Sequence, residues 1–239
     1  MAMFWIALLT FFASAAGTLT GFGTSTIMVT VLVLFFPLPE VLLFVGLVHF
    51  FDDIWKLMLF REGIRWRTVL LFGLPGVVMS WVGALIVVRA SDFFLPQLLG
   101  VFLVGYFIFI ALRPAFKFKP NALMVAAGGA ASGFLAGILG VGGLLRALFL
   151  SAFDFPKAVY IATSGAIALM VDGTRLTTYL YEGTELADVF LWGLIAFIPA
   201  SFFGSALAKR VVNRIPQKKF RLVVGGALFI IGLKLIFLG

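Results

Sequence analysis

The fold of this chain is decided by two glycine-containing stretches, Gly21-Phe22-Gly23-Thr24-Ser25 and Gly140-Val141-Gly142-Gly143. Each stretch interrupts a long apolar run, the first over residues 3–36 and the second over residues 122–153. A helix that crosses a bilayer is usually continuous over roughly 20 residues. Glycine is favoured where the backbone must take a positive φ. Glycine clusters inside both runs therefore predict two broken membrane segments.

The composition predicts a membrane protein. Of the 239 residues, 63% are hydrophobic and 12% are charged, whereas a soluble domain has about 25% charged residues. The first apolar run is too long for a cleaved signal peptide and has no basic residue before it, so we expect it to remain in the mature protein. We predict an all-α polytopic protein of the inner (plasma) membrane, in contact with the lipid bilayer.

Several classes of function are excluded or disfavoured by composition. The chain has no cysteine and one histidine, which excludes disulfides and thiol catalysis and disfavours a histidine-rich metal site. The net charge of +8 comes mostly from short loops between apolar runs, which is typical of cytoplasmic loops rather than of a nucleic-acid surface. No nucleotide-binding loop with a Gly-Lys-Ser/Thr ending is present. We expect no enzymatic activity, no cofactor, no metal and no nucleic-acid partner.

The two halves of the chain are repeats. We place the first over residues 1–112 and the second over 121–239, joined by a cytoplasmic linker at 113–120, with four apolar segments in each half and about eight to ten helices in total. Internal repeats with broken segments at equivalent positions point to the site of a transporter. The pairs separated by 119 positions are Gly21 and Gly140, Gly23 and Gly142, Gly46 and Gly165, Asp53 and Asp172, and Lys56 and Arg175.

Loop charge predicts the topology. Three arginines between residues 61 and 67 place that loop in the cytoplasm, while its counterpart at 182–188 has three acids and no base. Because equivalent loops face opposite sides, the repeats are predicted to be inverted, with both termini outside. Each broken segment must then begin and end on one side. We expect a hairpin with arms of about 14 to 16 residues, or ~21–24 Å, which is either re-entrant or fully spanning.

The breaks are candidates for an anion site. A helix that begins at each break presents unpaired N–H groups and the positive end of its dipole, and the hydroxyls of Thr24 and Ser25 are expected to act as donors or caps. Arg146 is costly near a membrane centre, and its guanidinium suits planar oxyanions. Its alternatives are an ion pair with Asp172 or Asp53, or extension to the membrane surface. The glycines have an alternative role in close helix packing. The predicted anion-site residues are Gly21, Phe22, Gly23, Thr24, Ser25, Gly140, Val141, Gly142, Gly143, Arg146, Thr163 and Ser164.

Charged residues on two helices form a second candidate group. The i, i+3 spacing places Asp53 beside Lys56 and Asp172 beside Arg175. These pairs are interpreted either as structural ion pairs or as the place where a coupling proton is exchanged. His49, one helical turn from Asp53, is either a packing residue or part of a proton relay.

The sequence resembles the sulfite exporter TauE/SafE (TSUP) family of anion transporters. The resemblance depends on Gly133-x-x-x-Gly137-x-x-Gly140-x-Gly142-Gly143, Phe155-Pro156, Ala158 and Ala162-Thr163-Ser164. It implies transport of small sulfur-containing anions or organic acids, such as sulfite, sulfoacetate and thiosulfate. The chain departs from the family pattern at Leu144, where many members have a third glycine, and at Arg146, which stands in an arm that is normally apolar.

These observations predict a secondary transporter of small sulfonates or related anions that works by alternating access, with export favoured and protons as a candidate coupling ion. The alternatives are import of thiosulfate or small carboxylates, a passive anion channel, or a membrane subunit that does not transport. An intramembrane aspartyl protease with Asp53 and Asp172 is disfavoured, because the basic neighbours would keep both acids ionised. The oligomeric state stays open, with a homodimer as one possibility.

Overall fold

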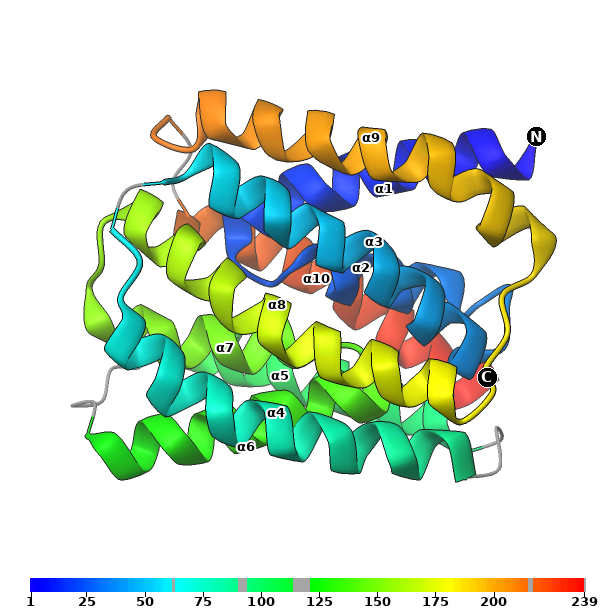
Figure 1. Ribbon diagram of the computed structural model, residues 1–239, viewed down its shortest axis with the longest axis horizontal. Helices are drawn as coiled ribbons and strands as arrows, with labels where there is room; N and C mark the ends of the chain where they lie inside the picture. The colour runs from blue at the N-terminus through cyan, green and yellow to red at the C-terminus, as the bar shows by residue number, and fades with distance from the viewer. Residues whose placement is uncertain (62, 90–93, 114–120, 215–216, 239) are drawn as a thin grey trace.

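The computed structural model describes residues 1–61, 63–89, 94–113, 121–214 and 217–238 (Figure 1). Across these ranges the secondary structure is entirely helical. Five of the helices, α1, α4, α5, α6 and α9, are long and apolar enough to cross a membrane. The predicted all-α polytopic membrane fold is therefore confirmed. In chain order the helices are α1 (Ala2–Thr20), α2 (Thr24–Leu32), α3 (Leu38–Leu59), α4 (Trp66–Arg89), α5 (Leu95–Leu112), α6 (Ala122–Leu139), α7 (Gly142–Leu150), the 3-10 turn η1 (Ser151–Phe153), α8 (Lys157–Tyr181), α9 (Asp188–Val211) and α10 (Gln217–Leu238).

The same order of elements occurs twice. A long helix, a break, a nine-residue helix and three long helices make up α1–α5 and again α6–α10. Two pairs of equivalent helices contact each other, α3 with α8 and α5 with α10. The other contacts are crossed between the halves: α1 packs on α9, and its equivalent α6 packs on α4. Two copies related by a two-fold axis would produce this pairing. The boundaries at 112 and 121 stay a prediction, and residues 114–120 of the predicted linker lie outside the described residues.

The arms of the two hairpins differ in length, so the expectation of 14 to 16 residues for each is wrong. The first arms, α1 and α6, have 19 and 18 residues, and the second arms, α2 and α7, have nine each. At about 1.5 Å per residue the first arm spans ~27–29 Å and the second ~14 Å. Apolar residues continue past each short arm into the turn at 33–36 and into η1. The length of the apolar run therefore led to an overestimate of the length of the second helix in each hairpin.

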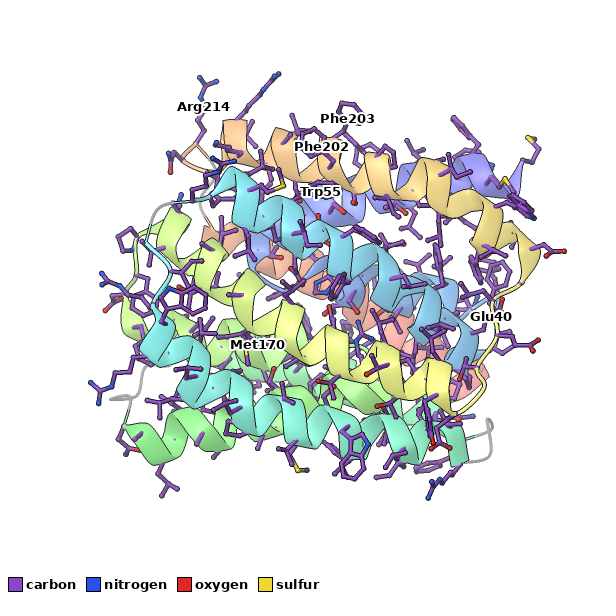
Figure 2. The ribbon with its side chains drawn as sticks, in the orientation of Figure 1. Glu40, Trp55, Met170, Phe202, Phe203 and Arg214 are labelled. Atoms are coloured by element: carbon purple, nitrogen blue, oxygen red, sulfur yellow. The ribbon has the colours of Figure 1, made fainter. Side chains whose placement is uncertain are left out.

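Charged loops separate to the two ends of the bundle. Both termini and the α8–α9 loop lie at one end, and the α3–α4 loop lies at the other (Figure 1). Arg214 lies at the same end as the α3–α4 loop, and Glu40 lies at the opposite end (Figure 2). There Glu40 accepts a hydrogen bond from the backbone N–H of Ala187 at 2.7 Å. The separation agrees with the distribution of loop charge that was used to predict the topology.

Glycines on α6 bring its backbone against that of α4. A Cβ placed on Gly133 would overlap the carbonyl oxygen of Gly76, and one on Gly137 would overlap that of Ser80. Close packing through small residues is common between membrane helices. The alternative role of the glycines, in close helix packing, therefore applies to Gly133 and Gly137. Both lie in α6, the first arm of the second hairpin, rather than at the break.

We expect Gly133→Ala to destabilise the protein by about 1–3 kcal/mol, because overpacking at a backbone contact forces the helices apart. Gly105→Ala is the matched control, since nothing lies within 4 Å of its added Cβ. Thermal unfolding in detergent should show a lower Tm for Gly133→Ala and an equal or higher Tm for the control. A Gly133→Ala protein that melts with the control would contradict the α4–α6 contact.

Candidate functional site

The two helix breaks lie directly against each other. The Ser25 hydroxyl in the first break donates a hydrogen bond to the carbonyl oxygen of Gly140 in the second, at 2.6 Å. A Cβ on Gly143 would overlap the carbonyl oxygen of Phe22. Gly21 and Gly140 end α1 and α6 in the left-handed conformation, with φ of 78° and 70°, which glycine adopts at little cost. The two breaks meet as predicted.

Of the two predicted roles, the hydroxyls at the start of α2 act as donors and not as caps. Gly23 is the N-cap residue of α2, and no side chain caps this helix. Thr24 instead donates to Asp52 Oδ2 at 2.5 Å, and Ser25 donates to Gly140. A carboxylate is a stronger acceptor for a hydroxyl than a neutral group, so Thr24 is drawn across to α3. The first N–H groups of α2 receive no side-chain cap.

A constricted pocket lies beside the first break. It has room for roughly one water molecule. The predicted residues that line it are Gly21, Gly23, Asp53, Lys56, Arg146 and Ser164. Residues that the sequence interpretation missed are Gly17, Thr18, Tyr160, Ile161 and Gly165. Of these, Tyr160 had a usable signal, because it precedes Ser164 by one helical turn.

Arg146 is buried at the pocket without a carboxylate partner. Its side chain is 4% exposed, and its Nε donates to the Ser164 hydroxyl at 2.9 Å. Among the described residues, no carboxylate oxygen lies within 4.0 Å of its nitrogens. The alternatives of an ion pair with Asp53 or Asp172, or of extension to the surface, are therefore not what the structure shows.

Carboxylates from both halves meet at His49. Its Nδ1 lies 2.5 Å from Asp172 Oδ2 and 3.2 Å from Asp53 Oδ2. Arg175 Nε lies 2.7 Å from Asp172 Oδ1, and Lys56 Nζ lies 2.9 Å from Asp53 Oδ1. Both i, i+3 pairs are thus formed, and His49 joins one pair to the other across the α3–α8 contact. His49, Asp53 and Asp172 are also spaced closely enough to hold a metal ion, but the two nearby bases make the group poor in free negative charge.

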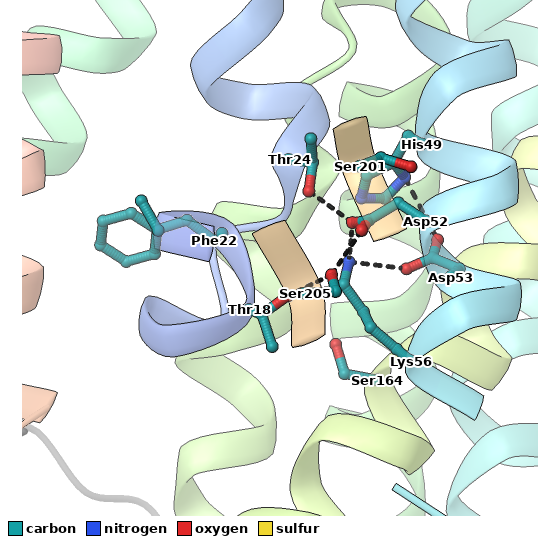
Figure 3. Close-up of polar contacts among 12 residues, drawn as sticks. Thr18, Phe22, Thr24, His49, Asp52, Asp53, Lys56, Ser164, Ser201 and Ser205 are labelled. Carbon is teal, nitrogen blue, oxygen red and sulfur yellow. Dashed lines mark hydrogen bonds and ion pairs between the residues drawn. The ribbon is translucent and has the colours of Figure 1, made fainter. Parts of the chain in front are cut away.

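Asp52 is the centre of a network that the sequence interpretation missed (Figure 3). Its Oδ2 lies 2.7 Å from Lys56 Nζ and accepts the hydrogen bond from Thr24, while its Oδ1 accepts from Ser205 on α9 at 2.5 Å. Ser205 also lies 3.1 Å from the Thr18 hydroxyl. The i, i+4 spacing to Lys56 was a signal for Asp52. Nothing local pointed to Ser205, which is 153 residues away.

Other predicted site residues pack or form hydrogen bonds elsewhere instead of lining the pocket. The Phe22 ring points away from the polar network (Figure 3) and packs edge-on against Tyr106. Val141 belongs to the hydrophobic core. A Cβ on Gly142 would overlap the carbonyl oxygen of Ser132. Thr163 accepts a hydrogen bond from the backbone N–H of Arg65 at 3.1 Å.

Comparison with known proteins identifies the family. Residues 6–235 match the sequence profile described as sulfite exporter TauE/SafE. The chain belongs to the sulfite exporter TauE/SafE family. This TauE/SafE chain is also similar to a probable membrane transporter protein of Methanocaldococcus jannaschii, with 27% identity over 191 residues that cover 72% of this chain and 68% of the relative. No solved structure matches it. The protein is a multi-pass membrane transporter of the TauE/SafE family, and its two interlocked breaks lie inside the matched region.

Proposed function

We propose that this protein is a secondary transporter of small sulfur-containing anions, of the sulfoacetate, sulfite or sulfonate type, and that it binds them at the pocket beside the two breaks. The observation that carries the proposal is Arg146, a buried cation that lines the pocket with no carboxylate within 4.0 Å among the described residues. A buried charge without a partner is costly. A small anion would give Arg146 a direct partner.

The surroundings of the pocket favour a ligand with oxygen atoms. The uncapped N-terminus of α2 supplies N–H groups and a positive dipole end, and Lys56, Ser164 and Tyr160 line the same space. A guanidinium can donate two parallel hydrogen bonds to two oxygens of a sulfonate or a carboxylate. The pocket therefore suits a compact oxyanion better than an apolar solute.

The constriction of the pocket favours alternating access. A space for roughly one water molecule has no room for a sulfonate, so the helices around it must separate for the anion to enter. We propose export when the anion accumulates in the cytoplasm, with the arginine-rich end of the bundle in the cytoplasm and both termini outside, in the inner membrane. Protons are the proposed coupling ion, exchanged within the group of His49, Asp53, Lys56, Asp172 and Arg175.

Flux measurements in proteoliposomes test the function. Vesicles loaded with radiolabelled sulfoacetate or sulfite should lose label much faster with the protein than without it. Unlabelled anion added outside should accelerate the exit, because a carrier exchanges one bound anion for another and a channel does not. Absence of protein-dependent flux across a panel of sulfur anions and small carboxylates would refute the proposal.

A further inference from the structure

The buried imidazole of His49 has one nitrogen engaged and one free. Nδ1 contacts the carboxylates of Asp53 and Asp172. Nε2 is buried and has no hydrogen-bond partner among the described residues, and the whole side chain is 3% exposed. Because two carboxylates face Nδ1, the neutral ring is assigned the tautomer with its proton there. Nε2 then presents an unpaired acceptor to its surroundings.

This free nitrogen and Arg146 converge on one point beside the first break. The position that a Cβ on Gly23 would take lies 3.0 Å from His49 Nε2 and 3.6 Å from Arg146 Nη2. Gly23 lines the pocket together with Arg146. That position is one bond length from the Gly23 Cα, but the two distances show that His49 Nε2 and Arg146 Nη2 lie at most about 6.6 Å apart, a span that one oxyanion can bridge with hydrogen bonds of ordinary length. An anion bound beside Gly23 would be reached by one group from each half of the chain.

The ionised groups around His49 balance one another. On its own helix, α3, lie Asp52, Asp53 and Lys56; on α8 lie Asp172 and Arg175; and Arg146 approaches from α7. The described, buried residues of α2 and α9, which also pack on α3, include no ionisable side chain. Three aspartates therefore face three bases, and the group has no net charge when His49 is neutral.

We propose that His49 takes up one proton when an anion enters the pocket, so that a monovalent anion and a proton move together without net charge transfer. The inference rests on the proposed function and assigns its coupling site and stoichiometry. A proton from water on the open side binds to the Nε2 lone pair. The new N–H donates to an anion oxygen beside Gly23. When the anion leaves on the other side, the proton returns to water there.

Charge and geometry each require the proton. Without it, a bound monoanion leaves the buried group with a charge of −1, and Nε2 opposes the anion oxygen with a lone pair. With it, the group and the anion sum to zero, and both nitrogens donate. Protonation of His49 thus changes a repulsive contact into an attractive one, which makes binding of the anion and of the proton mutually dependent.

Two amide substitutions separate the two sides of the imidazole. In His49→Gln the amide nitrogen takes approximately the place of Nε2 and donates permanently, but it does not titrate. In His49→Asn the amide lies approximately at the place of Nδ1, and the group beside Gly23 is lost. We expect any anion flux that remains in His49→Gln to occur without proton movement, and His49→Asn to lose most transport.

The experiment uses vesicles loaded with radiolabelled methanesulfonate and a pH-sensitive dye. Methanesulfonate stays a monoanion near neutral pH, so it carries no proton of its own. For the wild-type protein we expect one proton to leave per anion and a flux that does not respond to a membrane potential imposed with potassium and valinomycin. For His49→Gln we expect proton movement per transported anion to fall at least tenfold and the remaining anion flux to depend on membrane potential.

The wild-type measurement alone can overturn the inference, whatever the stability of the variants. Anion flux without proton movement, or flux that follows the membrane potential, would refute the one-to-one coupling. One proton per anion persisting in His49→Gln would refute His49 as the carrier. If the wild-type protein moves no labelled methanesulfonate, sulfoacetate or sulfite, the proposed function itself is wrong.

Discussion

Arg146→Ala is expected to lower the affinity for a bound sulfonate by about 30-fold to more than 1,000-fold, equivalent to ~2–5 kcal/mol. The guanidinium is buried in the pocket and has no carboxylate partner within 4.0 Å among the described residues. Its removal therefore deletes the main positive charge available to the ligand. Equilibrium binding of radiolabelled sulfoacetate to the purified protein measures the effect.

Stability and two milder variants provide the controls for this result. Among the described residues, Arg146→Ala breaks no ion pair within 4.0 Å and loses one hydrogen bond, to Ser164, so the affinity should fall by far more than the stability. Arg146→Lys keeps the charge but loses the planar fork, and its affinity should lie between those of Arg146→Ala and wild type. Ser164→Ala removes only the hydrogen bond to Nε. Wild-type affinity in Arg146→Ala would remove Arg146 from the site.

Asp172→Asn is expected to destabilise the protein by about 3–5 kcal/mol, because removal of one partner from a buried ion pair leaves an uncompensated charge. Arg175 is 1% exposed, and Asp172 is the one carboxylate within 4.0 Å of it among the described residues. Asp53→Asn is the matched comparison. It leaves Lys56 with Asp52 at 2.7 Å, so its effect should be smaller. Denaturation in detergent, followed by circular dichroism, compares the two.

A double variant tests the cause of the expected loss. Asp172→Asn combined with Arg175→Gln removes both charges, so we expect it to recover much of the stability lost in the single variant. Equal destabilisation by Asp53→Asn and Asp172→Asn would contradict the assignment of one carboxylate to Arg175 and two to Lys56. The same variants also test whether either aspartate carries the coupling proton, since their transport should then lose its dependence on a pH gradient.

Local sequence patterns predicted the breaks and the ion pairs. Gly21, Gly23 and Gly140 have positive φ, as glycine in an interrupted helix suggests. The i, i+3 pairs follow from helix geometry alone. Gly142 does not have positive φ and instead makes room for the Ser132 carbonyl. A glycine motif therefore contains residues with two physical roles, which spacing does not distinguish.

Long-range contacts set the limit of what the sequence could reveal. The Asp52–Ser205 hydrogen bond joins α3 to α9, and Tyr160 and Gly17 reach the pocket from helices of different halves. No periodicity in the chain pairs these residues, because their contacts depend on how whole helices cross. The lengths of the short arms were missed for a related reason. Apolar composition continues through the turns that follow them, and hydrophobicity does not mark where a helix ends.

The crossed packing of α1 on α9 and of α6 on α4 has an evolutionary consequence. Each broken hairpin covers the third long helix of the opposite half, so a half expressed alone would leave that helix without its cover. An ancestral gene that encoded a single half would have needed two copies, inserted in opposite orientations, to assemble the same bundle. Fusion of the two copies then frees each half to change on its own. That freedom is visible where Asp52, Thr24 and Ser205 have built a network that the other half lacks, with Val171 and Gly143 at the positions equivalent to Asp52 and Thr24.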